Sequence, residues 1–304
     1  TETLNIPKEK LAVTCCGGDT KKDIPKDAEA TEIWKSWGIA EEKIAYTKED
    51  NWWGPAGETG PCGPDTEIFY WKPKNIPVPK KFNPEDEENW VEIWNDVLMQ
   101  YYKDKKGNFI EAEQKNIDTG MGLERTLSVL NGLDDNYLAE VWQPIIQKIE
   151  KLSEKTYGKD EETTRAMRIV ADHIKASVMI LADSVIPGNS EQGYVLRRLI
   201  RRAIRYLREL GIEEQLVEIS KPVFDIYNDY EHLEKSKEKI VEELEKEHKK
   251  FLKTLDKGIK EFYKIIESSE DKRISGKDAF LLYQSYGFPI EITKELAKEK
   301  NLKV

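Results

Sequence analysis

The sequence predicts an α+β fold in which an antiparallel sheet is followed along the chain by an all-helical domain. Segments rich in apolar, aromatic and β-branched residues dominate up to residue 132 and are typical of strands. A glycine-containing turn joins two of them, as in a β-hairpin. Beyond Gly132, apolar residues recur at the spacing of amphipathic helices. Since 304 residues suit about two domains, we expect a mixed domain at 1–132 and a helical domain at 133–304.

In the first part of the chain, apolar, aromatic and β-branched residues predict strands, and glycine and proline mark where regular elements end. We expect strands at 11–16 and 66–71, and a short helix at 28–37 that Gly38 ends. Glycine and proline crowd the segment 51–64, which predicts a shaped loop and not a regular element.

The longest strand is expected at 90–102, where side chains alternate between two faces. Strict alternation places Asn95 and Val97 on one face. The other residues expected on that face are Val91, Ile93 and Met99. The turn at 105–108 leads into a returning strand that begins at Phe109. Successive hairpins of this kind indicate an antiparallel sheet and not a βαβ nucleotide-binding fold.

The second domain is predicted from four amphipathic segments. They span 140–154, 162–181, 193–210 and 231–267, of which the last is either one long helix or a helical hairpin. The third of these carries leucines on one stripe and arginines on another. Six arginines and no acidic residue lie between Tyr194 and Arg208, although the formal net charge of the chain is −10. An acidic protein with one concentrated basic stretch is suited to the local docking of a polyanion.

Composition excludes several classes of protein. No apolar run approaches the ~18–20 residues that a membrane span needs, and no signal peptide opens the chain. Three cysteines do not make a disulfide framework and fit a reducing compartment, so a cytoplasmic protein is expected. The three histidines show no zinc-finger spacing with cysteine. The first residue is Thr1, which suggests a piece of a longer protein.

The segment 115–130, KNIDTGMGLERTLSVL, carries the clearest chemistry. A strand is expected to end at Asp118, and Gly120 and Gly122 open a helix. The apolar face of this helix would be Leu123, Leu127 and Leu130. Glycines let a ligand approach the backbone, and a helix N-terminus favours anionic oxygens. Arg125 would add a cation for phosphate, and Asp118 a carboxylate for an ammonium group. The alternative is a helix cap with a surface arginine.

This segment resembles the third signature motif of class II aminoacyl-tRNA synthetases, in the form that the alanine–tRNA ligase family has. Further segments resemble the same family, in its order and spacing, so that the likeness covers nearly the whole chain. They are NWWGPAGETGPCGPDTEIFY at 51–70, EIWNDVLMQYY at 92–102, RIVADHIKASVMILADSVIPGNSEQGYVLRRLIRRAIR at 168–205 and LLYQSYGFPIEIT at 281–293. The resemblance implies an incomplete class II sheet, followed by a helical domain that recognises tRNA.

The resemblance also implies roles in activating alanine with ATP and Mg²⁺. Asp118 would bind the alanine ammonium group and Gly120 would line the substrate carboxylate and the adenylate. Gly122 and Arg125 would contact ATP. The small pocket around alanine would be made by Trp53, Asn95 and Val97. Taken without the resemblance, Trp53 and Val97 are ordinary core residues.

In the helical domain, the resemblance implies contacts with the acceptor stem of the alanine tRNA. Asn189, in the Pro-Gly-Asn loop, matches the asparagine that reads a G·U wobble at the third base pair. Gln284 stands where the family usually has an aspartate partner, and an amide can donate and accept. The arginines expected to hold the RNA backbone are Arg197, Arg201 and Arg205. Their alternative is a solvated helix face.

Two positions depart from the family pattern. Asp65 stands where the Gly-Pro-Cys-Gly-Pro-Cys loop ends in cysteine, and Asp96 stands where an aliphatic residue is usual. By alternation, Asp96 faces away from the pocket.

The family's first two motifs have no counterpart before Thr1, so a missing N-terminal part is an expected partner and the isolated chain is expected to be inactive. Its zinc-bearing editing domain would follow Val304, so no zinc is expected here. We therefore weigh three functions: part of a synthetase, an RNA-binding module without catalysis of its own, and a helical scaffold.

Overall fold

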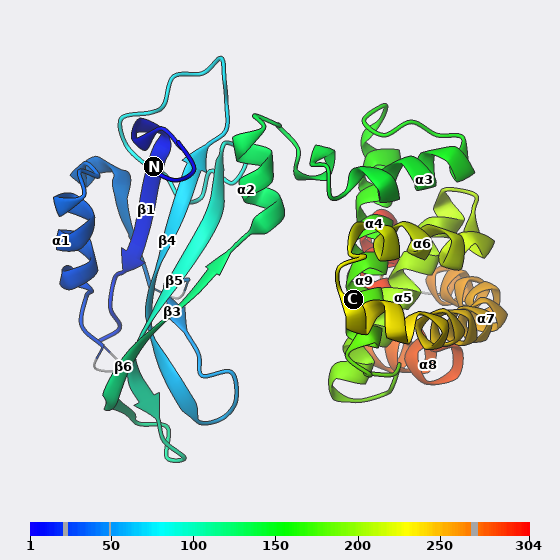
Figure 1. Ribbon diagram of the computed structural model, residues 1–304. Helices are drawn as coiled ribbons and strands as arrows, with labels where there is room; N and C mark the ends of the chain where they lie inside the picture. The colour runs from blue at the N-terminus through cyan, green and yellow to red at the C-terminus, as the bar shows by residue number, and fades with distance from the viewer. Residues whose placement is uncertain (21–23, 49, 269–272) are drawn as a thin grey trace. The chain divides into compact units, whose positions relative to one another are not determined.

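A computed structural model describes residues 1–20, 24–48, 50–268 and 273–304. The chain divides into two compact units, Thr1–Ala139 and Glu140–Val304, and each is described by itself (Figure 1). The division falls after the predicted boundary at 132/133. One reason is that the 3₁₀ turn Asn136–Leu138 belongs with the first unit, where Ser128 Oγ donates to Asn136 Oδ1 at 3.2 Å.

The first unit is built on one mostly antiparallel sheet, so the predicted fold class is confirmed. Its strands are β1 (Leu11–Cys16), β2 (Ile44–Thr47), β3 (Trp52–Trp53), β4 (Gly60–Trp71), β5 (Trp90–Lys103) and β6 (Phe109–Met121). They lie in the order β2-β1-β4-β5-β6, and β3 pairs with β4 (Figure 1). One pair departs from the prediction: β1 and β2 are parallel, because helix α1 (Ala28–Ser36) crosses over between them.

The segment predicted as a loop at 51–64 is partly strand. It contains β3 and the first residues of β4. The register between β4 and β5 shifts between Cys62 and Asp65, and this shift lets the glycine- and proline-rich sequence stay in the sheet. Gly63 is required there, because a Cβ atom would lie 1.9 Å from the carbonyl oxygen of Leu98.

Strand β5 does not alternate strictly, which corrects the predicted faces. Ile68 of β4 pairs with Trp94, but the next residue, Phe69, pairs with Glu92, so Ile93 is an extra residue on β5. Ile93 therefore joins a buried cluster on the face opposite Asn95. Val91 also packs in that cluster and not beside Asn95.

The two faces of this sheet are covered differently. On one face, α1 and α2 (Leu123–Leu130) pack over clusters that contain Val13 and Tyr70. On the other, Phe82 from the connection between β4 and β5 packs on Trp71 and Trp90. Further along this second face lie several polar side chains, among them Thr14, Asp65 and Glu67.

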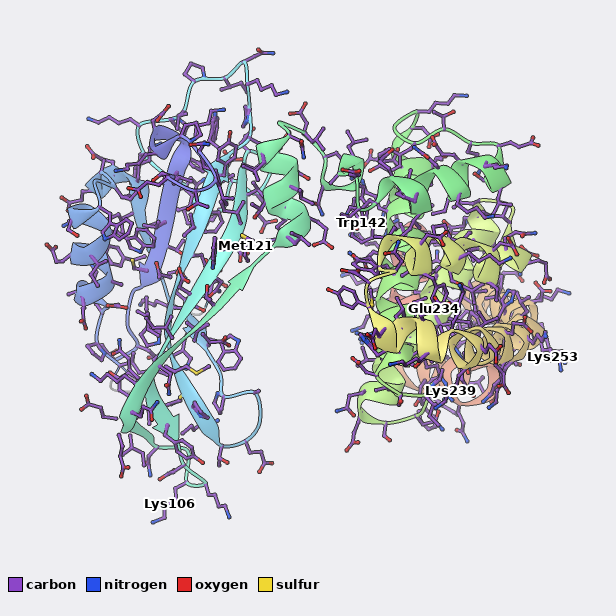
Figure 2. The ribbon with its side chains drawn as sticks, in the orientation of Figure 1. Lys106, Met121, Trp142, Glu234, Lys239 and Lys253 are labelled. Atoms are coloured by element: carbon purple, nitrogen blue, oxygen red, sulfur yellow. The ribbon has the colours of Figure 1, made fainter. Side chains whose placement is uncertain are left out.

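The strand before α2 is longer than predicted. β6 continues past Asp118 to Met121, which Figure 2 labels where the strand leads to α2. The predicted apolar face of α2 is wrong: Leu123 and Leu130 are 51% and 45% exposed. The buried residues of this helix are Thr126 and Ser128, and Val129 packs against the sheet.

The second unit is helical, as predicted. Its helices are α3 (Gln143–Ser153), α4 (Glu161–Ala182), α5 (Glu191–Glu209), α6 (Leu216–Ile226), α7 (Glu231–Glu267), α8 (Gly276–Tyr286) and α9 (Ile290–Glu299). Asp160 and Ser275 cap the first turns of α4 and α8. Among the described residues, no helix is both long and apolar enough to cross a membrane.

Candidate functional site

Four of the predicted site residues lie together on the polar face of the sheet. Val97 of β5 pairs with Asp118 of β6, and Asn95 pairs with Gly120. On the other side, Val97 pairs with Asp65 and Asn95 with Glu67 of β4. Directly paired residues of adjacent strands point to the same face of a sheet. Two rows therefore cross the strands, Asp65–Val97–Asp118 and Glu67–Asn95–Gly120, and we call them the polar rows.

The polar rows are open at β6 and closed toward β4. Asp118 and Gly120 are exposed, whereas Val97 is only 6% exposed and Asp65 is 2% exposed. A Cβ atom at Gly120 would meet nothing within 4 Å. Trp53 does not belong to the polar rows: it pairs with Gly63, further along β4.

Arg125 lies beside the polar rows at the start of α2. Its Nη1 donates to the Glu92 carboxylate at 3.0 Å and to the Glu92 carbonyl at 3.1 Å. Gly122 makes room for this arginine, because a Cβ atom there would lie 3.2 Å from Arg125 Cδ. The Gly122 amide donates to the Ile93 carbonyl at 3.0 Å and so ties the helix start to β5.

Arg125 also lines a cavity of about 790 Å³ on this face. The cavity is lined by side chains of both charges and by aromatic rings. They include Thr14, Glu67, Phe69, Trp90 and Glu92. Its size suits a small-molecule ligand.

A buried hydrogen-bond network supports the polar rows, and sequence reasoning missed most of it. Asn51 is fully buried, and its Nδ2 lies 2.8 Å from Asp65 Oδ1 and 2.8 Å from Thr14 Oγ1. Thr14 Oγ1 donates in turn to Glu67 Oε2 at 2.8 Å. Thr47 Oγ1 donates to Asn51 Oδ1 at 2.7 Å. Alternation along 66–71 could have placed Glu67 on the face of Phe69, but nothing in the sequence links Asn51 to it.

Two carboxyl groups of this face have unusual proton affinities. Burial raises the pKa of Glu67 to about 7, and the hydrogen bond from Thr14 opposes the shift only in part. Burial also raises the pKa of Asp65, against hydrogen bonds from Asn51 and Asn95. Both shifts follow from moving a charged carboxylate out of water.

The helical unit brings four of the predicted RNA-contacting residues to one cavity of about 390 Å³. These are Asn189, Arg197, Arg201 and Gln284. Asn189 and Gln284 are exposed, and the Arg197 guanidinium donates to Asn189 Oδ1. Lys250 of α7 also lines the cavity and is exposed. Sequence reasoning missed it because lysines recur all along this charged helix.

Arg201 and Arg205 are not placed to hold a phosphate, which corrects their predicted role. Arg201 is 5% exposed, and its Nε donates to the buried Glu247 at 2.7 Å. Arg205 is 4% exposed and pairs with Glu295 at 2.8 Å, and also with Glu299. Neither is part of a solvated helix face. The arginine stripe of α5 instead attaches α7 and α9 to the unit.

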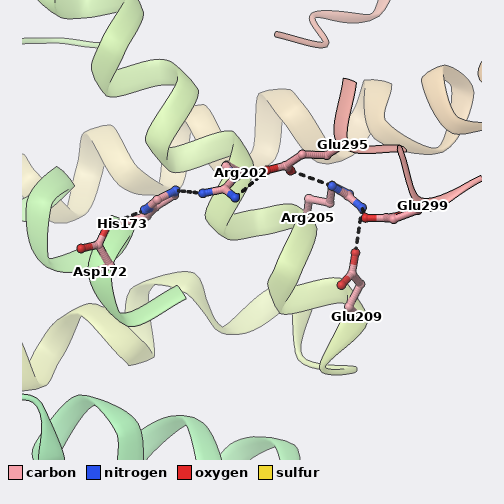
Figure 3. Close-up of polar contacts among 7 residues, drawn as sticks. All are labelled: Asp172, His173, Arg202, Arg205, Glu209, Glu295 and Glu299. Atoms are coloured by element: carbon pink, nitrogen blue, oxygen red, sulfur yellow. Dashed lines mark hydrogen bonds and ion pairs between the residues drawn. The ribbon is translucent and has the colours of Figure 1, made fainter. Parts of the chain in front are cut away.

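Figure 3 shows the contacts of α5 with α9 and with His173 of α4. Arg202 Nε donates to Glu295 Oε1 at 2.6 Å, and Arg202 Nη1 lies 2.8 Å from His173 Nε2. Since arginine only donates, His173 Nε2 accepts, and Nδ1 carries the hydrogen toward Asp172 at 2.8 Å. His173 is thus a buried structural residue of α4.

Comparison with known proteins agrees with this architecture. A family model described as "tRNA synthetases class II (A)" matches residues 1–304. The chain belongs to this family. It is 47% identical to the alanine–tRNA ligase of Borrelia hermsii over 301 residues, which is 97% of this chain and 50% of that protein. It is 48% identical to that of Borreliella afzelii over 308 residues, or 98% of this chain and 51% of that protein.

More distant alanine–tRNA ligases match as well. The one from Treponema denticola is 45% identical over 309 residues, which is 99% of this chain and 51% of that protein. The chain thus spans about half the length of these curated relatives. The range matched by the class II (A) family model includes both the sheet of the first unit and the helices of the second.

The raised pKa of Glu67 predicts a pH dependence of stability. The folded state binds this proton up to about pH 7, whereas an ordinary glutamate releases it near 4.5. The free energy of unfolding therefore falls as the pH rises between these values. Between pH 5 and pH 8, the free energy of unfolding of the unmodified protein should therefore fall by about 2 kcal/mol more than that of Glu67→Gln. Urea denaturation at the two pH values measures this difference. A difference that stays constant with pH would refute the assignment.

The buried Arg201–Glu247 pair predicts a large cost when only one partner is removed. Arg201→Met should lower the free energy of unfolding by up to about 3–5 kcal/mol, because Glu247 stays buried and keeps just its longer ion pair with Arg197, at 3.4 Å. The double variant Arg201→Met with Glu247→Leu should regain part of this loss, because it removes the buried carboxylate but also the ion-pair partner of Arg197. Urea denaturation measures both. If the free energy of unfolding of Arg201→Met lies within about 1 kcal/mol of that of the unmodified protein, the pair does not stabilise the fold.

Proposed function

We propose that this chain carries part of the active site of an alanine–tRNA ligase. In that reaction the alanine carboxylate attacks the α-phosphate of ATP, which releases pyrophosphate and forms alanyl-adenylate. The alanyl group then passes to the 3′ end of the tRNA. Such chemistry depends on positioning and charge stabilisation more than on a general base. The observation that carries the proposal is the pair of polar rows across β4, β5 and β6.

Alanine would bind at the open end of the polar rows. The exposed Asp118 carboxylate offers a partner for the ammonium group. Gly120 leaves open space where a side chain would stand, so a substrate can approach the backbone of β6. Val97 presents an apolar side chain between Asp65 and Asp118 and would contact the methyl group. Trp53 would wall the pocket from the side of β3.

ATP would occupy the cavity beside the polar rows. Arg125 is half-exposed, and its ion pair with Glu92 stabilises little, so it can turn to a phosphate group at low cost. Gly122 would let a phosphate approach the N-terminus of α2. Among the described residues, no cluster of three metal-ligating side chains occurs. Mg²⁺ bound to ATP needs only one or two carboxylates, and Glu67 and Glu92 both line the cavity.

The helical unit would recognise the acceptor stem of the alanine tRNA. Asn189 and Gln284 lie at one cavity and expose amide groups that can reach base edges in the shallow minor groove of RNA. Arg197 holds the Asn189 oxygen, so the Asn189 NH₂ group is the donor available to RNA. Lys250 would meet the backbone, whereas Arg197, which pairs with the buried Glu247 at 3.4 Å, would hold Asn189 in place. Because this cavity lies wholly within one unit, RNA binding without catalysis is the second candidate function.

Alanine-dependent exchange of pyrophosphate into ATP distinguishes these two functions, measured on the protein in its full-length form. Asp118→Asn should raise the KM for alanine by roughly 30-fold or more, because truncating one member of a charge pair costs about 2–5 kcal/mol. Asp96→Asn is the matched control, since Asp96 pairs with Thr119 on the opposite face. A KM within about threefold of the unmodified value would reduce Asp118 to a structural role. If pyrophosphate exchange is absent while RNA binding is intact, RNA binding without catalysis is favoured.

Acceptor-stem minihelices that differ only at the third base pair test the RNA contacts. Asn189→Ala should abolish the preference for G·U over G·C, at a cost of about 1–3 kcal/mol by analogy with other base-edge contacts. Lys250→Ala is the control for a backbone contact. It should weaken both minihelices alike and reduce the slope of log K against log[salt] by somewhat under one unit, with ~0.9 per phosphate of duplex DNA as a guide. If Asn189→Ala weakens both equally, Asn189 contacts the backbone.

A further inference from the structure

The amide of Asn95 is satisfied on one side only. Its Nδ2 donates to Asp65 Oδ2 at 3.4 Å. Its Oδ1 is buried and, among the residues that the structure describes, has no hydrogen-bond partner. Buried carbonyl oxygens normally accept a hydrogen bond, and leaving one without a donor costs free energy. A donor from a ligand would remove that cost.

Asp65 determines which way this amide points. A carboxylate only accepts hydrogen bonds, so it must face the NH₂ group of Asn95 and leave the oxygen on the other side. Asp65 is itself held in place, since its Oδ1 accepts from Asn51 Nδ2 at 2.8 Å. Asn51 is oriented by Thr47, whose Oγ1 donates to Asn51 Oδ1 at 2.7 Å. The direction of every bond from Thr47 to Asn95 is therefore fixed.

The Asn95 oxygen and the Asp118 carboxylate lie in adjacent polar rows. Asn95 and Val97 are neighbours on one face of β5, and Asp118 pairs with Val97. Diagonal neighbours of this kind are about 7–8 Å apart at most, and their side chains can reach one small group between them. An ammonium group has three donors and could satisfy both acceptors at once.

We propose that Asp65 is a positioning residue that holds the Asn95 amide with its oxygen toward the substrate ammonium group. This inference rests on the proposed function, and it assigns a role to the position where this chain departs from the family's cysteine. Asp65 does not touch the substrate. It acts through Asn95, while Asp118 supplies the opposite charge.

The substitution Asp65→Asn reverses the orientation without changing size. Asn51 still needs an acceptor, so the new amide turns its oxygen to Asn51 and its NH₂ group to Asn95. Asn95 then rotates, and its own NH₂ group faces the ammonium group. The KM for alanine should rise about 10- to 100-fold, whereas the KM for ATP should stay within about twofold. The measurement is pyrophosphate exchange with each substrate varied in turn.

The double variant Asp65→Asn with Asn95→Asp restores the pattern of donors and acceptors. The amide introduced on β4 donates to one oxygen of the carboxylate introduced on β5, and the other oxygen faces the ammonium group. The KM for alanine should return to within about fivefold of the unmodified value, which a purely structural role of Asp65 would not produce. Asp27→Asn is the matched control: Asp27 is also buried in this unit but caps α1, so the KM for alanine should not change.

Three results would overturn the assignment. One is an alanine KM within about twofold of the unmodified value in Asp65→Asn. Another is an equal rise of both KM values, and a third is a folded double variant without recovery. If the double variant does not fold, the split between the two KM values in Asp65→Asn decides alone. If the unmodified protein shows no pyrophosphate exchange, the proposed function fails. If it does exchange but Asp65→Asn gives one of the three results above, only the role of Asp65 fails.

Discussion

The register of β5 between β4 and β6 is the constraint on which the candidate active site depends. One extra residue, Ile93, shifts the pairing of β5 with β4. Because a shift by one residue exchanges the faces of a strand, Val91 packs in the core while Asn95 and Val97 join the polar rows. The same shift brings Glu92, the partner of Arg125, to the cavity. Backbone pairing thus positions both the proposed amino-acid end and the proposed nucleotide end.

Charge is handled differently in the two units. In the sheet, Asp65 and Glu67 have amides and hydroxyls as hydrogen-bond partners, and burial raises the pKa of both carboxyl groups. In the helical unit, buried charges occur as arginine–glutamate pairs that join α5 to α7 and α9. The attraction within such a pair offsets part of the cost of taking both charges out of water. The carboxyl groups of the sheet leave hydrogen-bond acceptors for a ligand, whereas the arginines of the helical unit stabilise the packing of its helices.

Sequence patterns predicted the elements better than the contacts that they make. Hydrophobic period and turn residues were enough for β1 and β5, but for 231–267 they left one long helix or a hairpin open, and the segment is the single helix α7. Alternation placed Val91 on the wrong face of β5, because the register shift at Ile93 arises from pairing with β4 and is not visible in the sequence of β5 alone. Helical spacing placed Arg201 and Arg205 on one stripe but could not reveal that Glu247 and Glu295, distant in sequence, pair with them. The grouping of Asn95, Val97, Asp118 and Gly120 was predicted through the family motifs, whereas the support from Asn51 required the fold.

We propose that one face of the sheet binds the amino-acid end of alanyl-adenylate. A crystal structure of the full-length protein with a non-reactive alanyl-adenylate analogue tests it most directly. We expect the amino group at hydrogen-bonding distance, about 3 Å, from both the Asp118 carboxylate and the Asn95 oxygen. We also expect Arg125 to be turned from Glu92 toward the phosphate. An amino group bound away from β5 and β6, with the Asn95 oxygen still without a donor, would contradict it.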